Sequence, residues 1–370
     1  MDNNELIQEK KSCRACGHKT LAPILSLGEI YVSDFLDDSA VAGQIKAPLD
    51  LILCGSCSLP QLRHTVSHES LYRNYWYRSG VNRTMTKELE DITRCIKKIV
   101  FLKSGDFVLD IGSNDGTLLR SYRKEEINLV GFEPAKNIVE QYGSVGIHKV
   151  FVDFFNYDIW ASEFKDKKAK AISAIAMFYD LEDPNAFVGD IVKCLDAEGL
   201  LVIQMAYLPS LLERNAFDGI CHEHLAIYSL ASLENLLKRH GLEIFDVELR
   251  DINEGSFRAY IRHRGGGRTF CVLPGAEKRI GAMRALEARL NLSNKKVYED
   301  FSRRVSEIKE KTVGFIKNET AKGRKIFAYG ASTKGNTLLQ YFGLDNKLIV
   351  AAAERNPDKW GKKTVGTNIP

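Results

Sequence analysis

The stretch VLDIGSNDGTLL, residues 108–119, decides the fold. Its apolar start is typical of a strand that ends at Asp110, and Gly112 and Gly116 then allow the backbone to turn closely against a ligand before a helix starts. A strand, a glycine-bearing loop and a helix in this order are typical of a doubly wound α/β fold. The stretch therefore predicts both the fold class and a cofactor site.

The next strand supplies a carboxylate that narrows the choice of ligand. Glu133 ends that strand 21 residues past Gly112, where it can accept hydrogen bonds from both hydroxyls of a ribose. The loop is not the dinucleotide fingerprint G-x-G-x-x-G, because Asn114 replaces the second glycine. This favours a nucleoside ligand without phosphates. S-adenosylmethionine fits, since its amino-acid tail can hydrogen-bond residues 112–115.

A third strand adds two more candidate contacts. Asp153 and Phe154 follow that strand, and they can bind the amino group and the ring face of adenine, respectively. With Glu133 in register, these residues complete a predicted site for S-adenosylmethionine.

The segments around this loop alternate between strands and helices. Five apolar strands with crossovers predict a doubly wound parallel sheet, and two further strands close together predict a terminal antiparallel hairpin. The strands of the sheet are predicted at residues 107–112, 129–134, 148–154, 171–178 and 199–205, those of the hairpin at 243–250 and 256–263, and two of the helices at 184–195 and 230–240.

Composition and pattern divide the chain into three parts. Residues 1–70 hold short strands, turn residues and two cysteine pairs. Residues 71–265 form the cofactor-binding α/β domain, and residues 71–100 are its helical lead-in. Residues 266–370 form a smaller C-terminal α/β domain. One long charged helix, at residues 281–322, precedes the strands of this domain. The chain stops where a sheet would normally continue, so we expect this domain to be truncated or to lack an ordered tail.

Two Cys-x-x-Cys pairs in the N-terminal part predict a metal centre. Cys13 with Cys16, and Cys54 with Cys57, each present two thiolates at the spacing of adjacent corners of a tetrahedron around zinc. Four thiolates leave no open position, so we expect a structural Zn²⁺ ion rather than a catalytic one. The alternative is four free or redox-active cysteines.

Composition excludes several classes of protein. The net charge of +4 is too small and too evenly spread for nucleic-acid binding. Apolar runs such as residues 171–178 fall well short of the roughly 20 residues that span a bilayer, and residues 1–11 contain no apolar signal core. We therefore expect a cytoplasmic monomer or small homo-oligomer that binds neither nucleic acid nor a membrane.

The stretch CHEHLAIYSL, residues 221–230, places two histidines around a glutamate. His222, Glu223 and His224 are compatible with a metal site, with proton transfer, or with an ordinary polar turn. The metal site is the poorest of the three, because two histidines that are two residues apart lack a third ligand in sequence and the helical spacing H-E-x-x-H is absent.

Two further segments offer contacts to an anionic substrate. Lys334 and Asn336 lie on a Gly-bounded turn at a helix start, which is a natural anion site and can hold a nucleotide diphosphate. The alternative is an ordinary turn with a solvated lysine. Arg258, in the stretch GSFRAY, is a candidate contact to a sugar or a phosphate.

Taken together, these motifs resemble those of a known family, the S-adenosylmethionine-dependent sugar C-methyltransferases, whose type member makes the branched sugar tetronitrose. The resemblance covers nearly the whole chain. It implies an N-terminal four-cysteine zinc module, a central class I methyltransferase fold and a C-terminal α/β unit. The matching stretches are CRAC…CGSC, YWYRSG, LDIGSNDGTLL, GFEP, HEHLAIYSL, GSFRAYIRH, AYGASTKGNTLLQYFG and ERNPDKWGKKTVGTNIP.

The resemblance also implies a reaction. The family acts on nucleotide-linked 4-keto-6-deoxysugars, in which the C3 proton is acidified because its carbanion delocalises as an enolate. By resemblance, His224 is the base and Glu223 orients or assists it. His222 is a candidate substrate contact, and Tyr75, in the stretch YWYRSG, lies near the keto oxygen or the hydroxyls of the sugar.

The chain differs from the family at three places that flank the implied sugar pocket. Cys221 stands where most relatives have tyrosine. The stretch AMFYDLED, residues 176–183, stands where relatives carry asparagine and histidine, so Tyr179 or Asp180 is expected to substitute for them. Met-Ala-Tyr at residues 205–207 replaces a common Glu-x-Pro. These differences concern the identity of the substrate and of the methylated carbon more than the reaction class.

Two other functions are compatible with the same residues. A sugar O-methyltransferase on this scaffold would need only a hydroxyl group as its acceptor. A non-catalytic, zinc-dependent binding protein would retain the cofactor pocket as a vestige.

Overall fold

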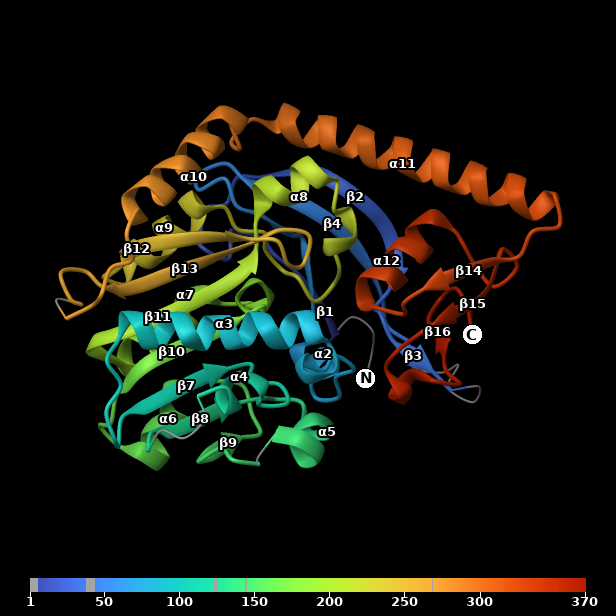
Figure 1. Ribbon diagram of the computed structural model, residues 1–370. Helices are drawn as coiled ribbons and strands as arrows, with labels where there is room; N and C mark the ends of the chain where they lie inside the picture. Colours follow the sequence, from blue (N-terminus) through green and yellow to red (C-terminus); the bar gives the residue numbers. More distant parts are fainter. Residues whose placement is uncertain (1–5, 38–43, 123–125, 144, 268) are drawn as a thin grey trace.

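The computed structural model describes residues 6–37, 44–122, 126–143, 145–267 and 269–370 (Figure 1). Its largest sheet has seven strands. Residues 1–5, part of the segment predicted to contain no signal core, lie outside the described residues. The strands follow one another across the sheet in the order β12-β13-β11-β10-β7-β8-β9. Their bounds are β7 (Phe107–Ile111), β8 (Asn128–Phe132), β9 (Lys149–Phe151), β10 (Ala169–Ile175), β11 (Leu195–Ala206), β12 (Leu242–Arg250) and β13 (Ser256–His263).

The directions of these strands confirm the predicted doubly wound sheet. Neighbouring strands from β11 to β9 run parallel, whereas β13 runs antiparallel to both β11 and β12. The α-helices of this part are α3 (Arg83–Ile99), α4 (Thr117–Arg120), α5 (Lys136–Ile138), α6 (Tyr157–Phe164), α7 (Pro184–Cys194), α8 (Leu208–Arg214) and α9 (Leu230–Arg239), and its short helical turns are η2 (Val139–Gly143), η3 (Phe178–Asp180) and η4 (Phe217–Gly219).

Helix α3 shows how the lead-in packs. Asn82 caps its start by accepting hydrogen bonds from the amides of Thr84 and Met85. Apolar side chains at helical spacing, from Met85 to Ile99, are buried against one face of the sheet together with Val202 of β11. The opposite face is covered by α6, α7 and α9, so the central sheet is buried on both sides.

The N-terminal module is built from short antiparallel sheets. Strands β2, β4 and β5 form one sheet, β1 pairs with β6, and α2 leads toward the central domain. Strand β4 ends at Cys54, a predicted zinc ligand. The bounds are β1 (Ile7–Glu9), β2 (Leu21–Tyr31), β3 (Phe35–Leu36), β4 (Lys46–Cys54), β5 (Pro60–Leu62), β6 (His64–Val66), α2 (His68–Tyr72) and η1 (Ser79–Val81).

The C-terminal part begins with two helices, whereas the sequence predicted one long helix at residues 281–322. Helix α10 (Ala276–Leu290) ends at Asn291, which has a left-handed φ of 53°. Asn294 then caps the start of α11 (Lys295–Ala321) through the amide of Lys296. The prediction of one continuous helix was therefore wrong, because two asparagines stop one helix and start another.

After α11 the chain forms a small α/β unit. Strands β14 (Ile326–Tyr329) and β15 (Ile349–Ala353) are parallel and are connected by α12 (Thr333–Phe342). The short strand β16 (Lys363–Thr364) returns to pair with β3 of the N-terminal module (Figure 1). Among the residues that the structure describes, every helix is too short or too polar to cross a membrane.

The three predicted parts share one hydrophobic core. Leu51 of β4, Leu211 of α8, Phe301 of α11 and Phe342 of α12 belong to the same buried cluster. The N-terminal sheet therefore packs against both the central domain and the C-terminal helices.

Arg258, predicted to contact a sugar or a phosphate, has a structural role instead. It lies on β13 with 0% exposure, outside the cavity described below. Its guanidinium donates to Gln204 Oε1 at 2.8 Å, to Glu88 at 2.9 Å and to Asp91 at 3.0 Å. These contacts join β13 and β11 to α3, and they occupy the donors that a substrate would need.

Replacing Arg258 with alanine tests this role. The change removes the fully buried one of the two guanidinium groups that pair with Glu88 and Asp91, so we expect the free energy of unfolding in urea to fall by about 1.5–3 kcal/mol, the usual worth of a hydrogen bond to a charged group. Arg250→Ala is the matched control, because Arg250 pairs with the same two carboxylates but its side chain is 28% exposed. A loss no larger than that of the control would contradict a buried structural role for Arg258.

Candidate active site and zinc centre

A cavity of about 660 Å³ lies at the carboxyl ends of the central strands. Its walls come from the ends of β7, β8 and β10, from residues 68–79, from Glu223 and His224, and from residues 332–334 of the C-terminal part. Ligands of open α/β sheets bind at this edge, where the helices alternate between the two faces. The cavity is therefore the candidate active site.

The loop after β7 forms the floor of the cavity with two residues in left-handed conformations. Gly112 has a φ of 71°, and a Cβ atom there would lie 3.1 Å from Met177 Cγ. Asn114 has a φ of 50°. Its side chain accepts from the amide of Ser79 at 2.9 Å and donates to the carbonyl of Tyr77 at 3.0 Å, so it ties the loop to the segment that covers it.

Two buried carboxylates line the same end of the cavity, as predicted. Glu133 accepts from the amide of Asn114 at 2.8 Å and from that of Ala135 at 2.9 Å, and burial raises its pKa. Asp110 accepts from Ser173 Oγ at 2.6 Å, and burial raises its pKa to about 7. Each carboxylate oxygen keeps a lone pair, so Glu133 can still accept from the hydroxyls of a ribose.

Asp153 and Phe154, the predicted adenine contacts, also line the cavity. Arg73, which the sequence did not single out, joins them. Its guanidinium lies 3.0 Å from Asp153 Oδ1 and 4.9 Å from the centre of the Phe154 ring. The cavity, the two carboxylates and this aromatic side chain together fit S-adenosylmethionine.

Glu223 stands at the other end of the cavity, with hydrogen-bond donors from two distant segments. Tyr75 Oη donates to its Oε2 atom at 3.1 Å, and Thr333 Oγ1 donates to Oε1 at 3.4 Å. Tyr72 Oη donates to its backbone carbonyl at 3.1 Å. Burial raises the pKa of Glu223 to about 7, so the carboxyl is close to half protonated at neutral pH.

His224 lies beside Glu223 in a tautomer that the structure fixes. Its Nδ1 atom is 2.6 Å from the carbonyl oxygen of Gly219, and because a carbonyl can only accept, Nδ1 carries the proton. Burial and then the charge of Lys334 lower its pKa to about 4. The imidazole is therefore neutral at pH 7, with a lone pair on Nε2. The ring of Tyr179 packs edge-on against it, with 4.5 Å between ring centres.

His222, predicted as a weaker substrate contact, points elsewhere. It is buried outside the cavity, and its Nε2 atom lies 3.1 Å from the carbonyl oxygen of Ala47 on β4. Burial lowers its pKa to about 4. His222 therefore anchors the loop to the N-terminal module, which its sequence spacing did not reveal.

Cys221, Glu223 and His224 offer a metal three ligand atoms within 4.8 Å of one another. Within the described ranges, no fourth histidine, cysteine or acidic ligand joins them. Nδ1 of His224 donates to the carbonyl of Gly219, so Nε2 is the ring nitrogen that can accept a proton or bind a ligand. Three ligand atoms are fewer than the four of the closed cysteine cluster.

The predicted anion contacts separate in the structure. Lys334 lines the cavity and forms an ion pair with Glu254. Asn336 is buried outside the cavity and donates to the carbonyl of Asp34 at 3.1 Å, so it attaches α12 to the N-terminal module. Only Lys334 of this pair is placed to meet a substrate.

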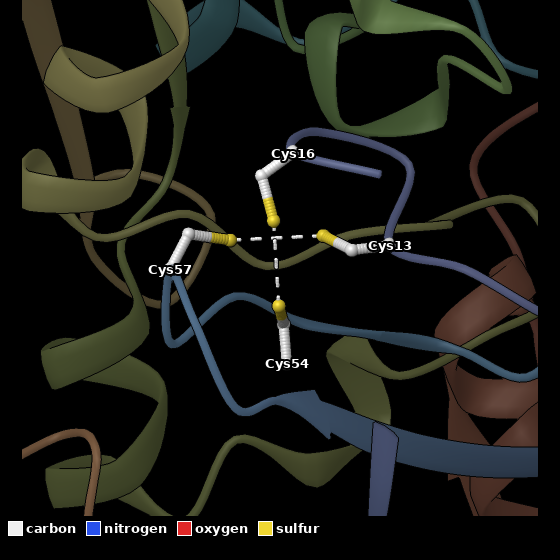
Figure 2. Close-up of side chains that lie close together, drawn as sticks. All are labelled: Cys13, Cys16, Cys54 and Cys57. Atoms are coloured by element: carbon white, nitrogen blue, oxygen red, sulfur yellow. Dashed lines mark hydrogen bonds between the residues drawn. The ribbon is translucent and has the colours of Figure 1, made fainter. Parts of the chain in front are cut away.

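The four predicted zinc ligands converge on one point (Figure 2). The Sγ atoms of Cys13 and Cys57 are 3.6 Å apart, and those of Cys16 and Cys54 are 3.5 Å apart. A tetrahedral site with Zn–S bonds of about 2.3 Å has edges of about 3.8 Å, so the sulfurs fit zinc. Gln61 Nε2 donates to Cys13 Sγ at 3.1 Å, as expected of a contact that stabilises a thiolate.

Comparison with protein families identifies all three parts of the chain in order. Residues 13–72 match a model described as "Putative zinc binding domain", residues 77–247 a "Methyltransferase domain", and residues 251–370 a "C-methyltransferase C-terminal domain". The three models and the relative described below support a C-methyltransferase. It is an S-adenosylmethionine-dependent enzyme with a class I methyltransferase fold and a zinc-binding module, as the sequence predicted.

One curated relative aligns with this C-methyltransferase along almost its whole length. C-methyltransferase NovU of Streptomyces niveus is 26% identical over 368 residues, which span 99% of this chain and 86% of NovU. Solved structures match about half of the chain at low identity. One is a chain of the complex between the Haloferax volcanii Trm112 methyltransferase activator and a methyltransferase. Its TM-score is 0.39 at 16% sequence identity, and the match covers 50% of the present chain and 95% of the matched chain. A Thermotoga maritima S-adenosylmethionine-dependent methyltransferase has a TM-score of 0.38, 16% identity and coverage of 50% and 91%.

Several residues of the C-methyltransferase site were missed from the sequence. Thr333 and Tyr72 contact Glu223 from segments 110 and 151 residues away. The stretch Asn253-Glu254-Gly255 could have been predicted as a tight turn, because such residues between two strands are typical of one. This turn reaches the cavity wall with Asn253 and Glu254.

Cys54→Ser tests the zinc centre. We expect wild-type protein to carry one zinc ion per chain, measured by inductively coupled plasma mass spectrometry. The variant should carry clearly less zinc and have a lower Tm, because one of the four thiolates is lost. Cys271→Ser is the matched control, since Cys271 is exposed and outside the cluster. Equal zinc content in both variants would remove Cys54 from the ligand set.

Proposed function

We propose that this C-methyltransferase acts on a nucleotide-linked 4-keto-6-deoxysugar and methylates it at C3 after His224 removes the C3 proton. The observation that carries the proposal is the fixed tautomer of His224, which leaves a proton-accepting Nε2 atom on a ring that lines the same cavity as the cofactor residues. The resemblance of the motifs to those of sugar C-methyltransferases supports the substrate class.

Carbon needs such a base, because a C–H group is a poor nucleophile. In the proposed step the C3–H bond breaks, the proton moves to Nε2 of His224, and the electron pair delocalises onto the C4 oxygen as an enolate. When bound, S-adenosylmethionine supplies the electrophilic methyl group. The enolate carbon would form the new C–C bond as the methyl–sulfur bond breaks and S-adenosylhomocysteine leaves, and the proton would stay on the imidazolium.

Tyr75 and Glu223 are placed to assist this step. The carboxyl of Glu223 has a pKa of about 7 and can hold a proton at neutral pH, and the Tyr75 hydroxyl is within hydrogen-bond distance of it. Either group can donate to the enolate oxygen, where negative charge develops. Tyr179, packed on the imidazole, limits the space around the sugar and keeps the ring of His224 in place.

Lys334 suits the nucleotide diphosphate, because it brings a cation to the cavity from the C-terminal part. Its charge is one of the causes that lower the pKa of His224. A diphosphate on Lys334 would offset that charge, so substrate binding would make the imidazole a stronger base. Binding and proton removal are thereby coupled through one lysine.

His224→Ala separates base catalysis from cofactor binding. We expect methyl transfer to a 4-ketosugar nucleotide to fall by about 10²–10⁴-fold, the usual worth of a general base, while the Kd for S-adenosylmethionine in calorimetry stays within about twofold of wild type. His263→Gln, outside the cavity, serves as the control histidine. Loss of cofactor affinity in the alanine variant would contradict the role of base.

Hydrogen exchange tests enolisation directly. Wild-type enzyme incubated with S-adenosylhomocysteine and a 4-ketosugar nucleotide in deuterated water should incorporate deuterium at C3, detected by mass spectrometry, because the base works without a methyl donor. His224→Ala should show none above the uncatalysed rate. Absence of exchange with wild type, together with methylation of a sugar nucleotide that has no ketone, would instead support O-methyl transfer.

A further inference from the structure

The lysine assigned to the diphosphate already has an anionic partner inside the protein. Lys334 Nζ contacts the carboxylate of Glu254, which lies in the connection between β12 and β13 of the central domain. Both residues line the main cavity, and both also line a smaller pocket next to His224. The ion pair therefore bridges the central and C-terminal parts at the candidate active site.

The turn that carries Glu254 is held in an unfavourable backbone conformation. Asn253 and Glu254 have φ values of 49° and 62°, a left-handed region that non-glycine residues rarely adopt. Gly255 follows with a φ of 105°, and a Cβ atom there would lie 2.6 Å from Ser210 Cβ. Non-glycine residues persist in such conformations where the surroundings determine them, commonly at ligand sites. The fold thus holds the carboxylate of Glu254 at the cavity wall.

A second carboxyl group lies near the same lysine. Burial and the charge of Glu254 raise the pKa of Asp218, and the charge of Lys334 offsets part of that rise. Asp218 is thus influenced by the charges of both members of the ion pair. An incoming anion has to compete with Glu254 for the cation.

We propose that Glu254 is a specificity-determining residue, whose carboxylate occupies Lys334 until the diphosphate of the substrate displaces it. This inference rests on the proposed function and identifies what the site selects. A diphosphate carries more negative charge than one carboxylate, so it wins the competition for the lysine. A sugar without phosphate offers nothing in exchange and leaves the ion pair closed. Glu254 therefore lowers the affinity for every anion that binds Lys334, so that an anion with the charge of a diphosphate is needed to displace it.

A double-mutant cycle read by calorimetry tests the competition without relying on turnover. The probes are thymidine diphosphate and uridine diphosphate, titrated into Glu254→Gln, Lys334→Met and the double variant. We expect Glu254→Gln to lower the Kd of the better-binding nucleotide by about two- to fivefold, which is the effect of a partly exposed ion pair, and to have no effect in the Lys334→Met background. Asp251→Asn is the matched control, because it removes a negative charge from the same connection but pairs with Arg214.

The outcomes distinguish this inference from the proposed function. Unchanged or weaker diphosphate binding in Glu254→Gln overturns the inference. An equal fall in the Kd when Glu254→Gln is made in the Lys334→Met background, or an equal fall in Asp251→Asn, also overturns it. The same holds if neither wild type nor Glu254→Gln binds a diphosphate. If the cycle gives the expected result but ketosugar nucleotides show no deuterium exchange, the competition stands and the proposed function fails.

Discussion

The pairing of β5 with the three residues that follow His224 is the constraint on which the active site depends. The amide of Leu62 donates to the carbonyl of Leu225 at 2.8 Å, and the amide of Ile227 donates to that of Pro60 at 2.9 Å. Strand β5 starts three residues after Cys57, so a zinc ion bound by the four cysteines would fix the strand, and the strand holds the chain segment that carries Glu223 and His224. The module that looks separate in sequence is thus part of the active-site scaffold.

The turn that carries Cys13 and Cys16 is also connected to the cavity, through different contacts. Arg14, between Cys13 and Cys16, is buried and lies 3.3 Å from the carboxylate of Glu182, which lines the cavity wall. The side chain of Asn185 donates to the carbonyl of Ala15 at 2.8 Å. Buried polar groups need such partners, because an unpaired charge or carbonyl in a dry interior costs free energy. The two cysteine turns therefore hold two walls of the cavity, and an intact metal centre and an ordered site belong together.

The parts of the molecule that depend on short spans of sequence were predictable. The glycine loop with Glu133, the cysteine pairs and the alternation of strands and helices each follow from local spacing, and the structure places the cofactor residues along one cavity. Roles that depend on distant partners were not predictable. Arg258 was predicted to contact the substrate, but in the structure it pairs with Glu88 and Asp91 of α3. His222 was predicted to lie at the active site like His224, but in the structure it contacts the carbonyl of Ala47 on β4. A sequence gives the chemistry of a side chain, whereas tertiary packing decides what it meets.

The same cavity combines two electrostatic requirements that oppose each other. Burial keeps His224 neutral and Glu223 near half protonation, which are useful states for removing and donating a proton, but burial also penalises the charge that forms when the imidazole accepts a proton. The adjacent Glu223 supplies a compensating negative charge once it has given up its own proton. The charge of Lys334 disfavours an imidazolium at His224, and the ion pair with Glu254 offsets part of that effect. Under the proposed function, a substrate diphosphate that replaces Glu254 on Lys334 would bring more negative charge than the carboxylate that it displaces, so the charge of the ligand would favour the imidazolium.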